Sequence, residues 1–134
     1  MGHELLEHTA DLGIRAWGPS LEAAVEEALL GLVEVMGVDA SGPGETRPVR
    51  GNGHDDASRL VALLNEVVFV VETEDVRVAS AKVSRDDGDL VAELEVAAAT
   101  APAQGISVKA ATYHQLAVEE QPDGSAEVRV FVDV

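Results

Sequence analysis

The sequence predicts an α+β fold: a two-layer sandwich in which a mostly antiparallel sheet carries two helices on one face. Two stretches have apolar residues at helical spacing, whereas the other apolar residues alternate in short runs. Clusters of Gly, Pro and Asp separate these runs, as turns separate the strands of hairpins. At 134 residues, the chain is expected to form a single domain over residues 1–134.

Two short strands, residues 4–7 and 13–17, are expected before the first helix, with a loop at residues 8–11 between them. Ser20 is a suitable N-cap for that helix, and Gly37 is a suitable stop after it. The apolar residues between them recur at a helical period, namely Leu21, Ala24, Val25, Ala28, Leu29, Leu32, Val33 and Met36. This pattern predicts a surface helix that covers the core.

The second helix depends on a choice between period and propensity. A possible edge strand at residues 46–50 precedes it, and Asp55 or Asp56 is the expected N-cap. The run 67–71 favours a strand by propensity, but the 3.6-residue period that begins at Leu60 favours a helix. We follow the period and predict a helix that continues through the run.

The rest of the chain is expected to form strands. They are residues 76–83, with a phase slip that suggests a bulge, followed by 90–98, 108–118 and 128–132. Residues 86–89 and 122–124 are turn signals, and residues 100–105 are an expected loop.

Charge and composition narrow the function classes. Nine basic residues against 25 acidic ones give a net charge of −16, and only 3% of the residues are aromatic. Because nucleic-acid affinity comes mainly from cations on phosphates and from stacking rings, we expect no direct nucleic-acid binding. Any role in RNA chemistry would pass through a partner protein. An acidity that serves only solubility is an alternative of equal weight. The absence of cysteine, of a membrane span and of a signal peptide predicts a cytoplasmic protein.

Two acidic segments are candidates for one metal site. Asp11 ends a loop of small and polar residues, where its alternative role is to bond nearby backbone N–H groups. At Asp133-Val134 the chain ends inside a strand pattern, so a side-chain carboxylate and the main-chain carboxylate are neighbours. Two such charges about 4 Å apart repel by roughly 4 kcal/mol at an effective dielectric constant near 20, which Ca²⁺ or Mg²⁺ would relieve. The alternative is a solvated strand end without a ligand.

Lys109 opens a third segment, Lys109-Ala110-Ala111-Thr112-Tyr113-His114. Its ammonium could balance the carboxylates or contact a phosphate. The alternative is a surface salt bridge worth less than about 1 kcal/mol. Whether His8, His114 or Glu66 takes part in the site stays open at this stage.

These segments, in this order, resemble the archease family. The resemblance rests on His8-Thr9-Ala10-Asp11 with Gly13-Ile14, Leu60 with Leu64-Asn65-Glu66, Lys109 with Thr112-Tyr113-His114, and the closing Asp133-Val134. It covers essentially the whole chain. Ala62 and Leu63 depart from the family, which often has an acid and a tryptophan at these places, so a metal-binding carboxylate from this helix is in doubt.

The resemblance implies a metal-binding protein that assists an enzyme and catalyses no reaction of its own. Asp11, Asp133 and Val134 match the family's metal site, which would hold a divalent ion, Ca²⁺ or alternatively Mg²⁺ or Mn²⁺. Lys109 matches a position needed for partner activation. The implied partner is the GTP-dependent tRNA-splicing RNA ligase, whose guanylylation and multiple turnover the family promotes in tRNA splicing and RNA repair. The alternatives are a general chaperone or adaptor, and a metal-dependent phosphoester hydrolase.

Overall fold

The computed structural model describes residues 1–7, 11–37, 44–99 and 105–134. In chain order, their helices and strands are β1 (Gly2–Glu7), β2 (Asp11–Gly18), α1 (Leu21–Met36), β3 (Glu45–Gly51), α2 (Asp56–Glu74), β4 (Val76–Asp86), β5 (Asp89–Ala98), β6 (Ala110–Glu120) and β7 (Ala126–Asp133). Each strand predicted from the sequence is present. Residues 8–10 and 100–104, where loops were expected, lie outside the described residues.

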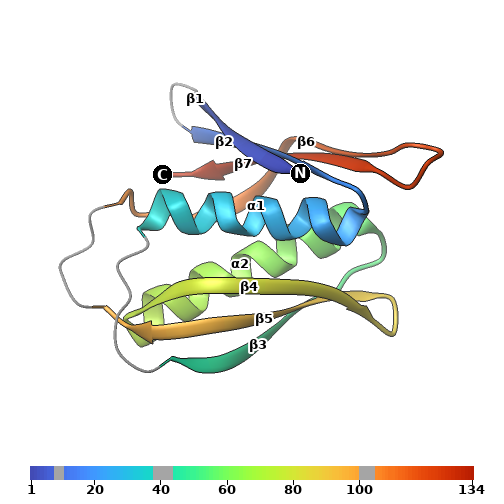
Figure 1. The fold of residues 1–134 in the computed structure, drawn as a ribbon. Helices are drawn as coiled ribbons and strands as arrows, with labels where there is room; N and C mark the ends of the chain where they lie inside the picture. Colours follow the sequence, from blue (N-terminus) through green and yellow to red (C-terminus); the bar gives the residue numbers. More distant parts are fainter. Residues whose placement is uncertain (8–10, 38–43, 100–104) are drawn as a thin grey trace.

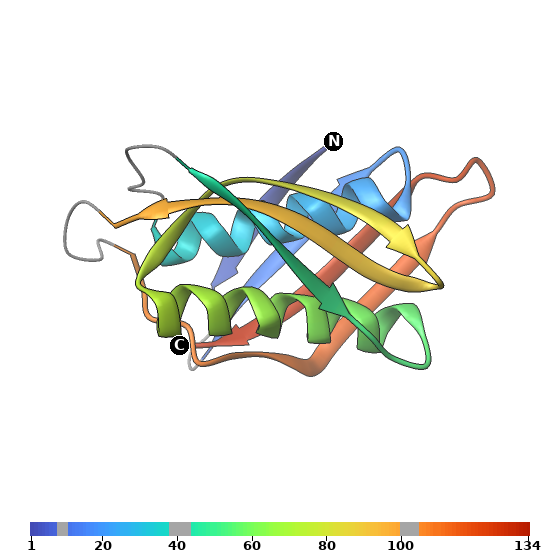
Figure 2. The same cartoon turned by 90° about the horizontal axis from the view of Figure 1, so that it is seen from below.

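The strands form two antiparallel sheets, and both helices lie between them (Figure 1). The four-stranded sheet has the order β1-β2-β7-β6, and the three-stranded sheet has the order β3-β5-β4. The predicted α+β class with antiparallel strands is therefore confirmed. The strands make two sheets where one was expected, and each sheet has the helices on one of its faces. In Figure 2, seen from below, the strands of the three-stranded sheet cross in front of the helix pair and those of the four-stranded sheet cross behind it.

Helix α1 begins and ends where the sequence predicts. The Ser20 hydroxyl accepts a hydrogen bond from the backbone N–H of Ala23 at 3.1 Å, which satisfies a donor of the first turn. At the other end, Gly37 has φ of 106° and its N–H donates to the Val33 carbonyl at 2.9 Å. A residue with a side chain is strained at this φ, so glycine suits the stop.

Helix α2 confirms that the period outweighs the propensity of the run 67–71. Asp55 is its N-cap: the Asp55 carboxylate accepts from the Ser58 N–H at 2.8 Å, and the Ser58 hydroxyl accepts from the Asp55 N–H at 3.2 Å. Most of the run is buried against the core, but Phe69 points outward and is 61% exposed.

One core fills the space between the two sheets. Its largest fully buried side chains come from both helices and both sheets, and include Ile14, Leu29, Leu32, Leu60, Leu64, Leu90 and Leu94. The predicted slip in β4 is a register shift between Val78 and Ser80. None of the helices in the described part of the chain has the length and apolarity needed to cross a membrane.

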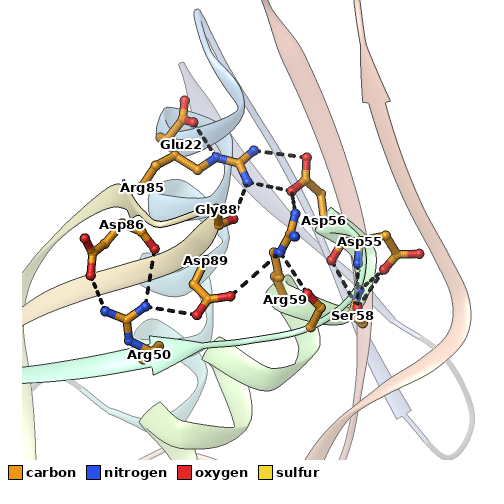
Figure 3. A network of polar contacts seen from close by, with 11 residues as sticks. Glu22, Arg50, Asp55, Asp56, Ser58, Arg59, Arg85, Asp86, Gly88 and Asp89 are labelled. Atoms are coloured by element: carbon orange, nitrogen blue, oxygen red, sulfur yellow. Dashed lines mark hydrogen bonds and ion pairs between the residues drawn. The ribbon is translucent and has the colours of Figure 1, made fainter.

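A network of ion pairs ties the β4–β5 hairpin to the starts of both helices (Figure 3). Arg85 donates to Glu22 of α1 at 2.9 Å and to the two carboxylate oxygens of Asp56 in α2 at 2.6 and 3.0 Å. Arg59 also donates to Asp56, at 3.0 Å. The hydrogen bond from Arg85, aided by that from Arg59, holds the pKa of Asp56 below its usual value.

Candidate functional site

Strands β2 and β7 bring the two predicted acidic side chains together. Asp11 and Asp133 are directly opposite in the antiparallel register, so their side chains leave the same face of the sheet. Asp11 is partly buried and is the first residue of β2, whereas the sequence placed it in the preceding loop. Asp133 is exposed.

The Asp11 and Asp133 face of the sheet is the one that points away from the helices. On β2 and β7, Ile14, Ala16, Val130 and Val132 are fully buried in the core between the sheets. Side chains alternate along a strand, so Asp11 and Asp133 point to the opposite side. Like charges directly opposite each other destabilise a sheet. The pair therefore gains stability from any cation that it binds.

The backbone of Lys109 is bonded to the backbone of Asp133. Its N–H donates to the Asp133 carbonyl at 2.9 Å, and the next residue, Ala110, is opposite Asp133 in the β6–β7 register. Lys109 is exposed, and together with Phe69 of α2 it lines a groove between the helix and the segment that enters β6. The structure thus connects the lysine to the acidic pair by a main-chain hydrogen bond to Asp133.

Asn65 fixes the start of β6, the free edge of the four-stranded sheet, to α2. Its side-chain oxygen accepts from the Ala111 N–H at 2.7 Å, and its amide nitrogen donates to the Ala111 carbonyl at 3.3 Å. A side-chain amide here replaces the missing neighbour strand. In the sequence, Asn65 was noted only as part of Leu64-Asn65-Glu66, the segment that resembles the family. No local pattern in the sequence indicates its contact with Ala111.

An aromatic contact lies on the same face as the acidic pair, at Phe131, two residues before Asp133 in β7. Phe131 is 5% exposed and packs over Gly13, where an added Cβ would lie 2.8 Å from the ring. The His114 ring contacts the Phe131 ring edge-on, with 6.2 Å between their centroids. A register shift between Thr112 and Ala117 and the positive φ of Gln115, 53°, allow β6 to present His114 in this way.

The remaining candidates lie at different positions. Glu66 is exposed on α2, next to Asn65. Leu63, at the place where the family often has a tryptophan, is fully buried and contributes to the core. His8 lies outside the described residues.

The oxygen donors near the end of β7 are suited to a hard divalent cation. Asp11 and Asp133 supply carboxylate oxygens, and Val134, which follows β7, is 40% exposed. Ca²⁺ and Mg²⁺ prefer such oxygen ligands. In the part of the chain that the structure describes, no group of three or more His, Cys, Asp or Glu side chains is arranged to hold a metal ion. Any ion bound by Asp11 and Asp133 would therefore need further oxygen ligands, such as main-chain oxygens.

The sequence relatives point to one family. A model of the Archease protein family (MTH1598/TM1083) matches residues 3–134. The archease-like protein of Dictyostelium discoideum is 34% identical over 143 residues, covering 98% of this chain and 92% of the relative. The archease of Thermococcus kodakarensis is 33% identical over 130 residues and is covered to 90%, as is this chain.

Solved structures share the fold. Protein 1598 of Methanobacterium thermoautotrophicum has a TM-score of 0.71 and 26% identity, with 99% of both chains covered. An archease of Thermotoga maritima, TM1083, described as a possible chaperone, has a TM-score of 0.70 at 21% identity, with 98% of this chain and 96% of that chain covered. The resemblance inferred from the sequence motifs is confirmed, and the chain belongs to the archease family.

Proposed function

We propose that this protein is a metal-binding, non-enzymatic activator of a GTP-dependent tRNA-splicing RNA ligase, acting in the cytoplasm. The observation that carries the proposal is the register of β2 and β7, which sets Asp11 opposite Asp133 while the backbone of Lys109 bonds to Asp133. The closeness of Asp11 and Asp133 in this register supports a proposed ion site that the two strands share.

The carboxylates of Asp11 and Asp133 and the main-chain oxygens of Val134 would hold the ion, for which we propose Ca²⁺, with Mg²⁺ or Mn²⁺ as alternatives. Bound there, a divalent ion would balance the charge of the two facing carboxylates and remove the repulsion between them. The residues themselves fix the arrangement, because Asp11 and Asp133 are held in register by two strands and Asp133 is also bonded to Lys109.

The charge of the chain supports a protein partner. A net charge of −16 repels RNA but attracts a ligase surface that is basic enough to bind RNA ends. Association of the two proteins would therefore be fast and would slow as salt screens the attraction. In this proposal the protein catalyses no step itself. It influences the ligase reaction only through its contacts with the ligase.

The test follows GMP attachment to the ligase of the same organism, with Ca²⁺ present or chelated. Asp11→Asn removes one charge of the proposed metal site and should lower stimulation at least tenfold. Glu127→Gln is the matched control, because Glu127 lies on the same sheet face in β7 and bonds Arg15 at 2.7 Å. Normal stimulation by a folded Asp11→Asn protein would contradict the metal site. If the wild-type protein did not stimulate the ligase, the activator function would be contradicted.

A chaperone is the second candidate, because the Thermotoga maritima relative is described as a possible chaperone. The two functions differ in their need for the metal and in partner range. Suppression of aggregation of several unrelated proteins, at equal strength by the wild type and Asp11→Asn, would favour the chaperone.

A further inference from the structure

A cavity of about 230 Å³ lies at the end of the molecule where both helices stop. Met36, the last residue of α1, and Asp75, the C-cap of α2, both line it. Figure 1 shows the two helices running toward this same end of the sheets, on the left of the view. The volume is smaller than that of sites for drug-sized ligands and suits a molecule of fewer atoms.

Main-chain contacts fix the wall of the cavity that faces the helices. Gly105 and Ile106 line this wall, and the Ile106 N–H donates to the Val35 carbonyl in the last turn of α1 at 2.8 Å. Gly105 lies so close to the helix that an added Cβ would be 2.3 Å from the same carbonyl oxygen. A side chain does not fit there, so glycine allows the segment that enters β6 to close against α1. The cavity is therefore formed before any ligand binds.

Arg77 of β4 brings a buried positive charge to this cavity, where it is only 6% exposed. Within the described part of the chain it makes no ion pair, and its side chain makes one hydrogen bond, from Nη1 to the Val76 carbonyl at 3.1 Å. Nε and Nη2 have no acceptor there, yet neither is sealed from solvent, so both open toward the cavity. A buried guanidinium without a counter-ion is costly, and its N–H groups match the two oxygens of a carboxylate.

The surroundings of Arg77 are otherwise negative. Glu72 and Asp75 line the cavity on its solvent side, and both are exposed. The C-terminal ends of the two helices add partial negative charge, and neither helix has a basic residue in its last turn. Compensation of these helix ends accounts for the charge of Arg77 but leaves its open N–H groups without acceptors. The cavity therefore disfavours a ligand with negative charge alone and favours one that also carries a positive group.

We propose that this cavity binds a small zwitterionic α-amino acid with an apolar side chain. Its carboxylate would bond Arg77, its ammonium would face Glu72 and Asp75, and its side chain would lie against Met36 and Val71, which are 6% and 7% exposed. A bare metal ion is disfavoured, because no group of three or more His, Cys, Asp or Glu side chains among the described residues is arranged to hold one. This site is separate from the acidic pair and does not depend on activation of the ligase.

The first experiment titrates the full chain with leucine and with two analogues that each lack one charge, using calorimetry and thermal unfolding. Isocaproate lacks the ammonium and isopentylamine lacks the carboxylate. Leucine should bind and raise the melting temperature, and each analogue should bind about tenfold more weakly because it loses one charged contact. The proposal is overturned if leucine, valine and methionine all fail to bind at millimolar concentration. It is also overturned if isocaproate or inorganic phosphate binds as tightly as leucine.

The second experiment places the ligand in this cavity by substitution. Arg77→Lys keeps the charge but loses the paired N–H groups, so leucine should bind about tenfold more weakly. Arg129→Lys is the matched control, because Arg129 is exposed on the four-stranded sheet, and it should leave binding unchanged. The double variant Glu72→Gln, Asp75→Asn should weaken leucine but not isocaproate, and it tests the site even if Arg77→Lys does not fold. Wild-type affinity of the double variant for leucine would overturn the proposal.

Discussion

Asn65 in α2 holds Ala111 in β6 by both of its backbone polar groups, and this contact connects the helix layer to the strand that borders the candidate site. Two residues before Ala111, the N–H of Lys109 bonds to Asp133, which in turn faces Asp11. A chain of backbone contacts therefore runs from α2 to the acidic pair.

Replacing Asn65 tests this connection. Asn65→Ala leaves the N–H and carbonyl of a buried residue, Ala111, without their side-chain partner. The free energy of unfolding should fall by about 1–3 kcal/mol, as for other unpaired buried polar groups. Urea unfolding measures the loss, and ligase stimulation by the folded variant should fall with it. Glu66→Ala, at the exposed neighbouring position, should change neither quantity; equal effects of both variants would contradict the role of Asn65.

Gly13 is required by the ring of Phe131. In Gly13→Ala the new Cβ would lie 2.8 Å from Phe131 and 2.9 Å from the Cβ of Leu6, so the ring must move. Overpacking of this kind costs about 1–3 kcal/mol. Thermal unfolding measures the cost, and Phe131→Leu combined with Gly13→Ala should show a favourable interaction energy in a double-mutant cycle. Strictly additive losses would show that the contact between the two positions does not limit packing.

His3 makes stability depend on pH. It bonds Glu34 at 2.7 Å and Glu27 at 3.1 Å, both on α1, and these hydrogen bonds raise the pKa of His3 above its usual 6.5. Both ring nitrogens face carboxylates, so both donate only in the charged form. Because the folded-state pKa exceeds the unfolded value, this stabilisation is complete below about 6.5 and is lost as pH rises through the folded-state pKa.

The His3→Ala variant isolates that contribution. Its loss of melting temperature relative to wild type should be larger at about pH 5.5 than at a pH above the raised folded-state pKa, where the imidazole loses its charge. An equal loss at both pH values would contradict the pairing of His3 with α1.

Arg85 links three elements, so its removal should loosen the hairpin and both helix starts. Arg85→Gln breaks the bonds to Glu22 and Asp56, and the expected loss is only about 1 kcal/mol because all three side chains are partly exposed and screened. The loss should be present at neutral pH and fade in acid, since the lowered pKa values of Glu22 and Asp56 mean that their stabilisation disappears as pH falls through those values. Denaturant unfolding at both pH values checks this, with Arg129→Gln as the control.

The sequence predicted the helices and strands better than it predicted which strands pair with each other. The caps Ser20 and Asp55 and the period from Leu60 are local signals, and both helices follow them. The choice of neighbours in a sheet depends on residues far apart in the chain, so the division into two sheets was not predictable from periodicity. In the candidate site the acidic residues were found by resemblance and by their position. Their register, the Asn65 contact and the bulge that turns His114 onto Phe131 required the folded chain.

The pairing of β2 with β7 has a consequence for synthesis of the protein. β2 is made early and β7 last, so β1, β2 and α1 must wait for the rest of the chain before the four-stranded sheet is complete. Until then the edge of β2 that β7 will occupy is unpaired, and strands in that state readily join other chains. Contacts between such distant segments also form slowly. A nascent chain should therefore be most prone to aggregate just before Val128, Val130 and Val132 emerge from the ribosome and cover that edge.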